Sequence, residues 1–148
     1  MYTSVHTAVG TSIVMGTYAI TKSELLAATV GGALAFASHD AVDRLGETSY
    51  GGFKNFLKME LTLLALFIFS AAISGFWELF IVGWIGGNAM DLVDKKGGLS
   101  ILDKKKYPFT KFFRCHRRQP NITFNQDATY TAGFISGIVI VLIGFVSS

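Results

Sequence analysis

The chain has 148 residues with a formal net charge of +3; 51% of them are hydrophobic, including 13 phenylalanines, and only 16% are charged. The mean hydropathy is +0.45. A soluble domain of this size exposes much of its surface and usually carries more charge, so the composition argues against a soluble domain and favours an integral membrane protein.

Five apolar runs separate the polar stretches, and each predicts a helix, because backbone in hydrocarbon must satisfy its own hydrogen bonds. In chain order they cover residues 5–21, 24–38, 59–75, 76–93 and 129–146. A span needs about 20 residues, so the second run is the weakest and is also compatible with a re-entrant helix. We predict an all-α fold with one domain over residues 1–148, a polytopic transmembrane bundle of about five helices with a long polar loop at 95–128. A compact, all-helical soluble core is the alternative.

Small residues recur within these runs. The sequences are "GGALAFAS" in the second, "SAAISG" in the third, "GWIGG" in the fourth and "GFISG" in the fifth. Glycine and alanine on a helix surface let neighbouring backbones approach closely, which is how membrane helices pack. The runs therefore predict a tightly packed bundle.

Lysine and arginine set the expected orientation. Of 13 such residues, three lie in Arg44–Lys58 and nine in Lys95–Arg118. Two apolar runs separate these stretches, so both stretches are expected on one side, and the positive-inside rule makes that side cytoplasmic. We therefore predict a multi-pass inner (plasma) membrane protein with cytoplasmic basic loops. The single cysteine, Cys115, excludes an intrachain disulfide and fits a reducing compartment.

Side chains able to bind a metal gather at the ends of runs that this topology places at the cytoplasmic face. The metal-ligand candidates are His6, His39, Asp43, Asp91 and Asp94. Two further residues expected at the same face are candidates for catalysis, Asp40 and His116. The question is why uncharged runs such as "TVGGALAF" end in a histidine and several carboxylates.

The spacing of these residues suits shared ligation. His39 and Asp43 are four apart, and Asp91 and Asp94 are three apart, so each pair lies on one helix face; Asn88 extends the second face by a turn. Imidazole and carboxylate together favour zinc, with manganese or iron as alternatives. The alternative interpretation is that these are solvated helix ends, whose acids are balanced locally by basic neighbours.

The loop "DKKKYPFTKFFRCHRR" mixes basic and aromatic residues. Beside a membrane this mixture favours contact with anionic lipid headgroups over nucleic acid. Arginine binds phosphate through two parallel hydrogen bonds. Arg114, Arg117 and Arg118 are therefore candidates for holding a substrate phosphate.

Three segments, "VHTAVG", "SHDAVDRL" and "GGNAMDLVDKKGG", carry a resemblance to a known family. They resemble small prokaryotic inner-membrane proteins described as membrane-bound metal-dependent hydrolases, which have an early histidine, a His–x3–Asp helix and a glycine-rich run into PD-x-x-D-K. The resemblance covers roughly the first hundred residues in short islands and implies metal binding by the five ligand candidates named above. Met90 stands where the family has proline. The family's later His–Thr/Ser element has no clear counterpart here, and His116 in "RCHRR" is a candidate substitute for it.

Together these features predict an integral membrane, metal-dependent hydrolase. The metal would lower the pKa of a bound water, and Asp40 could act as general base. A phosphoester in a lipid or lipid-linked substrate is the expected substrate class, because the site would lie at headgroup depth beside basic residues. The expected partners are membrane lipids, without nucleic acid, and a homo-oligomer is left open. The alternative is a non-enzymatic membrane protein, an oligomeric scaffold, ion transporter or partner anchor, whose His/Asp cluster is structural.

Overall fold

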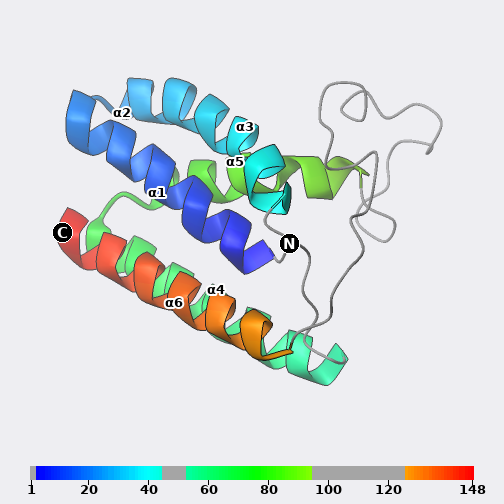
Figure 1. Ribbon diagram of the computed structural model, residues 1–148. Coiled ribbons are helices and arrows are strands. Elements are labelled where there is room, and N and C mark those ends of the chain that lie inside the picture. The colour runs from blue at the N-terminus through cyan, green and yellow to red at the C-terminus, as the bar shows by residue number, and fades with distance from the viewer. Residues whose placement is uncertain (1–2, 45–52, 95–125) are drawn as a thin grey trace.

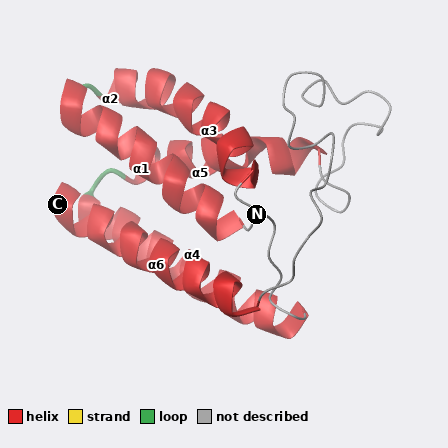
Figure 2. Ribbon diagram, viewed as in Figure 1, coloured by secondary structure: helices red, strands yellow, loops and turns green. Residues whose placement is uncertain are grey.

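The computed structural model describes residues 3–44, 53–94 and 126–148, and these ranges are almost entirely helical (Figures 1 and 2). The helices are α1 (Thr3–Thr21), α2 (Glu24–Leu26), η1 (Ala27–Gly31), α3 (Gly32–Arg44), α4 (Phe53–Ser74), α5 (Trp77–Asp94) and α6 (Gln126–Ser147). The segment η1 is a π-helical turn that joins α2 to α3 without a break. The predicted all-α fold is confirmed over the described residues.

The second helical segment is longer than its apolar run predicted. It continues through η1 and α3 to Arg44, so "ASHDAVDR" is helical and does not follow the helix. The stretch holds no proline or glycine that would end a helix after Ser38. His39 and Asp43 therefore lie one helical turn apart on α3, as their spacing predicted.

Two short turns at one end of the bundle have clear local causes. Lys22 has a positive φ of 54° after α1, and Ser23 caps the next helix by accepting a hydrogen bond from the backbone N–H of Leu26 at 3.3 Å. Gly75, with φ of 72°, ends α4. That left-handed conformation favours glycine, because it has no Cβ to clash.

Helix α1 lies at the centre of the bundle. On one side it packs with α3 and α5, and on the other it packs against α6, which pairs closely with α4 (Figure 1). The two termini lie at opposite ends of the bundle, and the ends of α3 and α5 lie at the same end as the N-terminus (Figure 1). The candidate metal-binding segments of α1, α3 and α5 therefore share one end.

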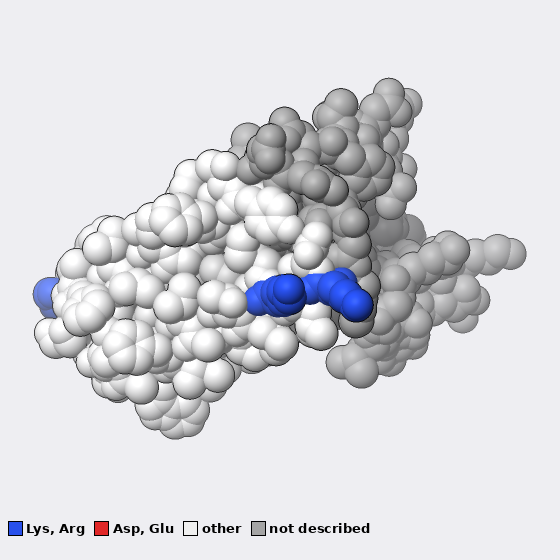
Figure 3. All heavy atoms as spheres, turned by 90° about the horizontal axis from the view of Figure 1, so that it is seen from below, with Lys and Arg blue, Asp and Glu red and all other residues white. Residues whose placement is uncertain are grey.

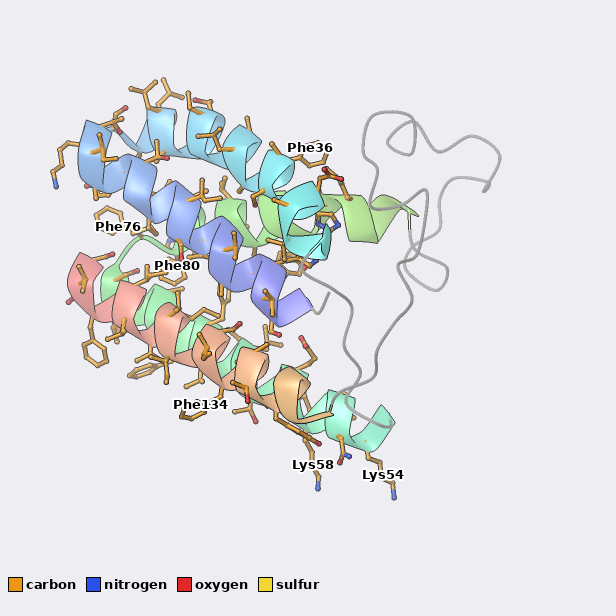
Figure 4. All side chains as sticks on the ribbon, viewed as in Figure 1. Phe36, Lys54, Lys58, Phe76, Phe80 and Phe134 are labelled. Carbon is orange, nitrogen blue, oxygen red and sulfur yellow. The ribbon has the colours of Figure 1, made fainter. Side chains whose placement is uncertain are left out.

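Aromatic contacts fill the interior further along the bundle. Phe67 of α4 packs against Phe80 of α5 with ring centroids 5.5 Å apart. Tyr18 of α1 packs against Phe76 with centroids 4.6 Å apart. Phe76 and Phe80 both point from α5 and its preceding turn towards the other helices (Figure 4). The Phe67–Phe80 contact joins the two halves of the bundle, and the Tyr18–Phe76 contact joins α1 to the turn before α5, both away from the histidines.

The described surface is apolar to an extent unusual for a soluble protein, and several polar side chains are buried. Large apolar side chains are exposed, for example Ile20 at 85% and Phe134 at 68%, whereas polar side chains such as His39 and Thr11 are completely buried. Three helical stretches are long and apolar enough to cross a membrane: Glu24–Val42, Leu57–Ser74 and Tyr130–Ser147. The membrane character predicted from composition is thus supported, and the segment predicted to be weakest is one of the three.

The first and fourth apolar runs are not among these three stretches, although both form long helices, α1 and α5. Polar residues explain this difference. The face that α1 turns to its neighbours carries Ser4, His6, Thr7 and Thr11, all buried, and α5 contains three acidic residues. Lipid contacts an inner helix less than an outer one, so an inner helix tolerates polar side chains that face the bundle.

Candidate functional site

The site is built on a close crossing of α1 and α5, where glycines replace side chains. A Cβ atom at Gly83 would lie 2.6 Å from the Cα of Thr11, and one at Gly10 or Gly87 would overlap backbone of the facing helix. On the other side of α5, a Cβ at Gly86 would lie 3.0 Å from the Cβ of Ala35 in α3. The "GWIGG" sequence therefore allows both α1 and α3 to approach α5 at backbone distance.

Two histidines meet at this crossing. The rings of His6, from α1, and His39, from α3, are stacked with centroids 4.1 Å apart and planes 10° apart. Their side chains are 1% and 0% exposed. Residues 33 positions apart in the sequence thus form one buried pair, and the prediction that these two candidates lie together is supported by this contact.

His39 is oriented by the backbone of α5. Its Nδ1 lies 2.8 Å from the carbonyl oxygen of Gly87. A carbonyl can only accept a hydrogen bond, so Nδ1 carries the proton and donates it. In the neutral ring Nε2 then carries the lone pair and is the atom able to coordinate a metal. Metal-ligating histidines are usually held in this way, with the other ring nitrogen donating to a carbonyl or carboxylate.

A second polar cluster lies beside the histidines. Asn88 donates from Nδ2 to Thr7 Oγ1 at 3.1 Å and to the carbonyl oxygen of Trp84 at 2.8 Å. Asn88 Oδ1 and the hydroxyls of Ser4 and Thr11 are buried without a hydrogen-bond partner within the described residues. Leaving such groups unsatisfied costs about 1–3 kcal/mol each. Buried polar groups of this kind in a membrane protein are typical of a functional region.

A cavity of about 210 Å³ lies between the two halves of the bundle, next to this cluster. Its polar groups come from Ser4 and Thr7 of α1 and from Glu60 of α4. Trp84 of α5 forms an aromatic wall, and the rest of the lining is apolar. One of its walls includes Leu61, which is 55% exposed. The cavity therefore extends from the buried polar cluster to the apolar outer surface of α4.

The other candidate residues are placed only in part. Asp40 lies on α3 and is half-buried. Asp43 lies one turn beyond His39 on α3, and Asp91 one turn beyond Gly87 on α5. Outside the described side chains lie Asp43, Asp91, Asp94, Arg114, His116, Arg117 and Arg118. Among the side chains that are described, no group of three or more histidine, cysteine, aspartate or glutamate residues could hold a metal ion.

The stacked histidines place a geometric condition on metal binding. Each imidazole lone pair lies in its ring plane, and the two planes are only 10° from parallel. Such planes do not converge close to the rings, so one ion at about 2.1 Å from both nitrogens would lie far out of at least one ring plane. His39 fits a ligand role as it stands. His6 fits as a ligand of the same ion only after its ring turns.

Sequence reasoning did not identify Gly87, Thr7 or Ser4 as site residues. Gly87 takes part through its backbone carbonyl, which accepts the hydrogen bond from His39. Every residue has such a carbonyl, so the residue type gives no signal. A signal for the two hydroxyls was present, because Ser4, Thr7 and Thr11 recur with helical spacing and mark one polar face of α1 in an otherwise apolar run.

The comparisons with known proteins yield no relatives: no protein-family model, no curated protein and no solved structure matches this chain. The functional assignment therefore rests on the geometry and chemistry of the chain's own residues.

Proposed function

We propose that the chain is an integral membrane, metal-dependent hydrolase that acts at the cytoplasmic face on a phosphoester of a lipid or lipid-linked substrate. The observation that carries the proposal is the hydrogen bond from His39 Nδ1 to the Gly87 carbonyl. It fixes the tautomer and orientation that a metal-binding histidine needs. It also joins the His–x3–Asp turn of α3 to the glycine-rich turn of α5 that runs into Asp91 and Asp94.

The proposed topology has all five long helical segments crossing the membrane, with the end that contains the histidines in the cytoplasm. The opposite positions of the termini support an odd number of crossings (Figure 1). Lys54, on the first turn of α4, belongs to one of the two basic stretches, whereas Lys22 lies at the α1–α2 turn, at the other end of the bundle.

Single-cysteine labelling tests this topology in a Cys115→Ser background. We expect a membrane-impermeant maleimide to label a Lys22→Cys variant in intact cells, and to label a Lys54→Cys variant only after permeabilisation. Both positions are exposed, so labelling reports sidedness and not burial. Labelling of both variants from the same side would contradict the five-span arrangement.

In this proposal His39, Asp43, Asp91 and Asp94 hold the metal, which zinc suits best. The bound metal would supply a water of lowered pKa as nucleophile. Asp40, on the same helix as His39, is assigned as general base. His6 packs on His39 and limits the positions that the His39 ring can adopt.

Residues of the polar loop complete the proposed substrate site. Arg114, Arg117 and Arg118 are assigned to the substrate phosphate, and His116 to proton transfer. The cavity beside Ser4 and Thr7 supports a substrate with an apolar tail, because a polar end within the bundle continues into an apolar wall.

Elemental analysis of the detergent-purified protein tests the proposal. We expect near-stoichiometric zinc, manganese or iron in the parent, and at least a tenfold loss in a His39→Ala/Asp43→Ala double variant, with hydrolysis of phosphoester substrates lost in parallel. Glu78→Ala is the control, because Glu78 is an exposed acid in the first turn of α5, far from Gly87 along the same helix. Absence of metal from the parent after reconstitution with each ion would refute the proposal.

A second function, a non-enzymatic scaffold, is favoured by one specific observation. The stacked histidines, the Gly87 carbonyl and the Asn88–Thr7 hydrogen bond together form a polar packing core that joins α1, α3 and α5. Interhelical hydrogen bonds of this kind stabilise membrane bundles without any metal. A metal-free parent whose unfolding is sensitive to His39→Ala would establish this function instead.

A further inference from the structure

Two hollows lie on the outer side of the α4–α6 pair. The lysine hollow has a volume of about 200 Å³ and is lined by Asn55, Lys58, Met59, Thr62 and Tyr130. The glycine groove has a volume of about 280 Å³ and runs between α4 and α6, with Gly133 and Gly137 among its lining residues. Met59 and Thr62 line both. The two hollows are therefore adjacent, one more polar and the other apolar.

The lysine hollow has the chemistry of an anion site. Lys58 is exposed, and Lys54 lies one turn before it on the same helix face. Both project away from the bundle on the side that also carries Phe134 (Figure 4). Asn55 and Tyr130 add an amide and a phenol, each able to donate a hydrogen bond. On the face seen in Figure 3, the described residues near these lysines include no acidic side chain.

The glycine groove has the dimensions and polarity of an acyl-chain site. Its lining residues on α6 extend from Gly133 to Leu142, which at 1.5 Å per residue is about 14 Å, close to the ~15 Å thickness of one hydrocarbon leaflet. Its glycines let side chains of α4 approach α6 closely, because a Cβ at Gly137 would lie 3.1 Å from Leu63 Cδ2 and one at Gly133 would lie 3.1 Å from Met59 Cε. Phe134 and Leu142 border the groove and are 68% and 56% exposed.

We propose that the lysine hollow and the glycine groove together bind one anionic phospholipid, with its phosphate at Lys58 and one acyl chain along Gly133 and Gly137. Basic residues at the membrane surface attract anionic headgroups, and here the apolar groove begins one helical turn from the charge. The occupant is a lipid and not a second copy of the chain, because a two-fold pairing through this face would bring the lysines of both copies together. Neither histidine lines this proposed lipid site, and lipid binding there does not depend on hydrolysis.

Native mass spectrometry of the protein released from bilayers of mixed phosphatidylglycerol and phosphatidylcholine tests the proposal. We expect the parent to retain one phosphatidylglycerol in preference to phosphatidylcholine. Lys58→Gln should reduce that preference at least fivefold, and Gly137→Phe should reduce retention of both lipids. Lys22→Gln is the matched control, because Lys22 is also an exposed lysine at a helix end but lies at the opposite end of the bundle, and it should behave as the parent.

Two further measurements keep the outcome interpretable. Lys58→Glu changes only an exposed side chain and should abolish the phosphatidylglycerol preference even if Gly137→Phe does not fold, as judged by its elution profile. Equal lipid retention by the parent, Lys58→Gln and Lys58→Glu would overturn the proposal. A dimeric parent that becomes monomeric with Gly137→Phe, with lipid retention unchanged, would also overturn it and assign the groove to a second copy.

Discussion

Gly10→Ala is expected to destabilise the bundle by about 1–3 kcal/mol, the usual cost of overpacking, whereas Gly16→Ala on the same helix should leave stability unchanged or slightly increased. A Cβ at position 10 would overlap the carbonyl oxygen of Gly83 and lie 3.1 Å from the backbone nitrogen of Gly87. Neither backbone atom can move without displacing α5. A Cβ at position 16 would meet nothing within 4 Å, and alanine favours a helix more than glycine does.

The comparison is made by unfolding both variants in mixed micelles with increasing SDS, followed by tryptophan fluorescence. Gly10→Ala should unfold at a lower SDS concentration than the parent. It should also lose the proposed metal binding, because the displacement of α5 would move the Gly87 carbonyl away from His39. Equal unfolding of the two variants would show that the α1–α5 crossing is looser than its glycines indicate.

The helices were largely predictable, because hydrocarbon leaves the backbone few alternatives to helix and because the apolar runs end at polar stretches. The apolar run of the second segment stops at Ser38, while the helix continues to Arg44. His39 and Val42 are buried against neighbouring helices, so this end of α3 is held by packing that average hydropathy does not measure.

The number of spans was less predictable than the number of helices. Hydropathy selects the helices that face lipid, and α1 and α5 face other helices more than α4 and α6 do. The buried hydroxyls of α1 lower its hydropathy for the same reason that they mark the interior of the bundle. A span prediction based on composition therefore weakens where the buried polar residues lie.

The meeting of the two histidines was predictable from the sequence, but its geometry was not. The positions of His6 and His39 near the ends of successive apolar runs placed both at one end of the bundle, and the structure brings their rings into contact. Residue types and spacing carry no information on ring stacking, because it depends on the crossing distance set by Gly10, Gly83 and Gly87. Ligation by the carboxylates stays a prediction.

His39→Phe is expected to remove bound metal, at least tenfold, while His6→Phe retains it within about twofold. Phenylalanine replaces either ring by one of similar shape and preserves aromatic packing, but it has no nitrogen. In the observed stack only His39 is oriented as a ligand by the Gly87 carbonyl, and the nearly parallel planes prevent both rings from reaching one ion. Metal content of the two purified variants, measured beside the parent, checks this expectation.

The pair of variants separates packing from ligation, because each keeps an aromatic ring in the stack. Equal loss of metal in His6→Phe and His39→Phe, with both variants folded, would mean that the His6 ring turns when metal binds and that both histidines are ligands. Retention of metal by His39→Phe would instead remove the central ligand of the proposed hydrolase. If the parent is folded and free of metal, the histidine stack is a structural contact. The difference in unfolding between the parent and His39→Phe would then measure how much the hydrogen bond to Gly87 contributes to stability.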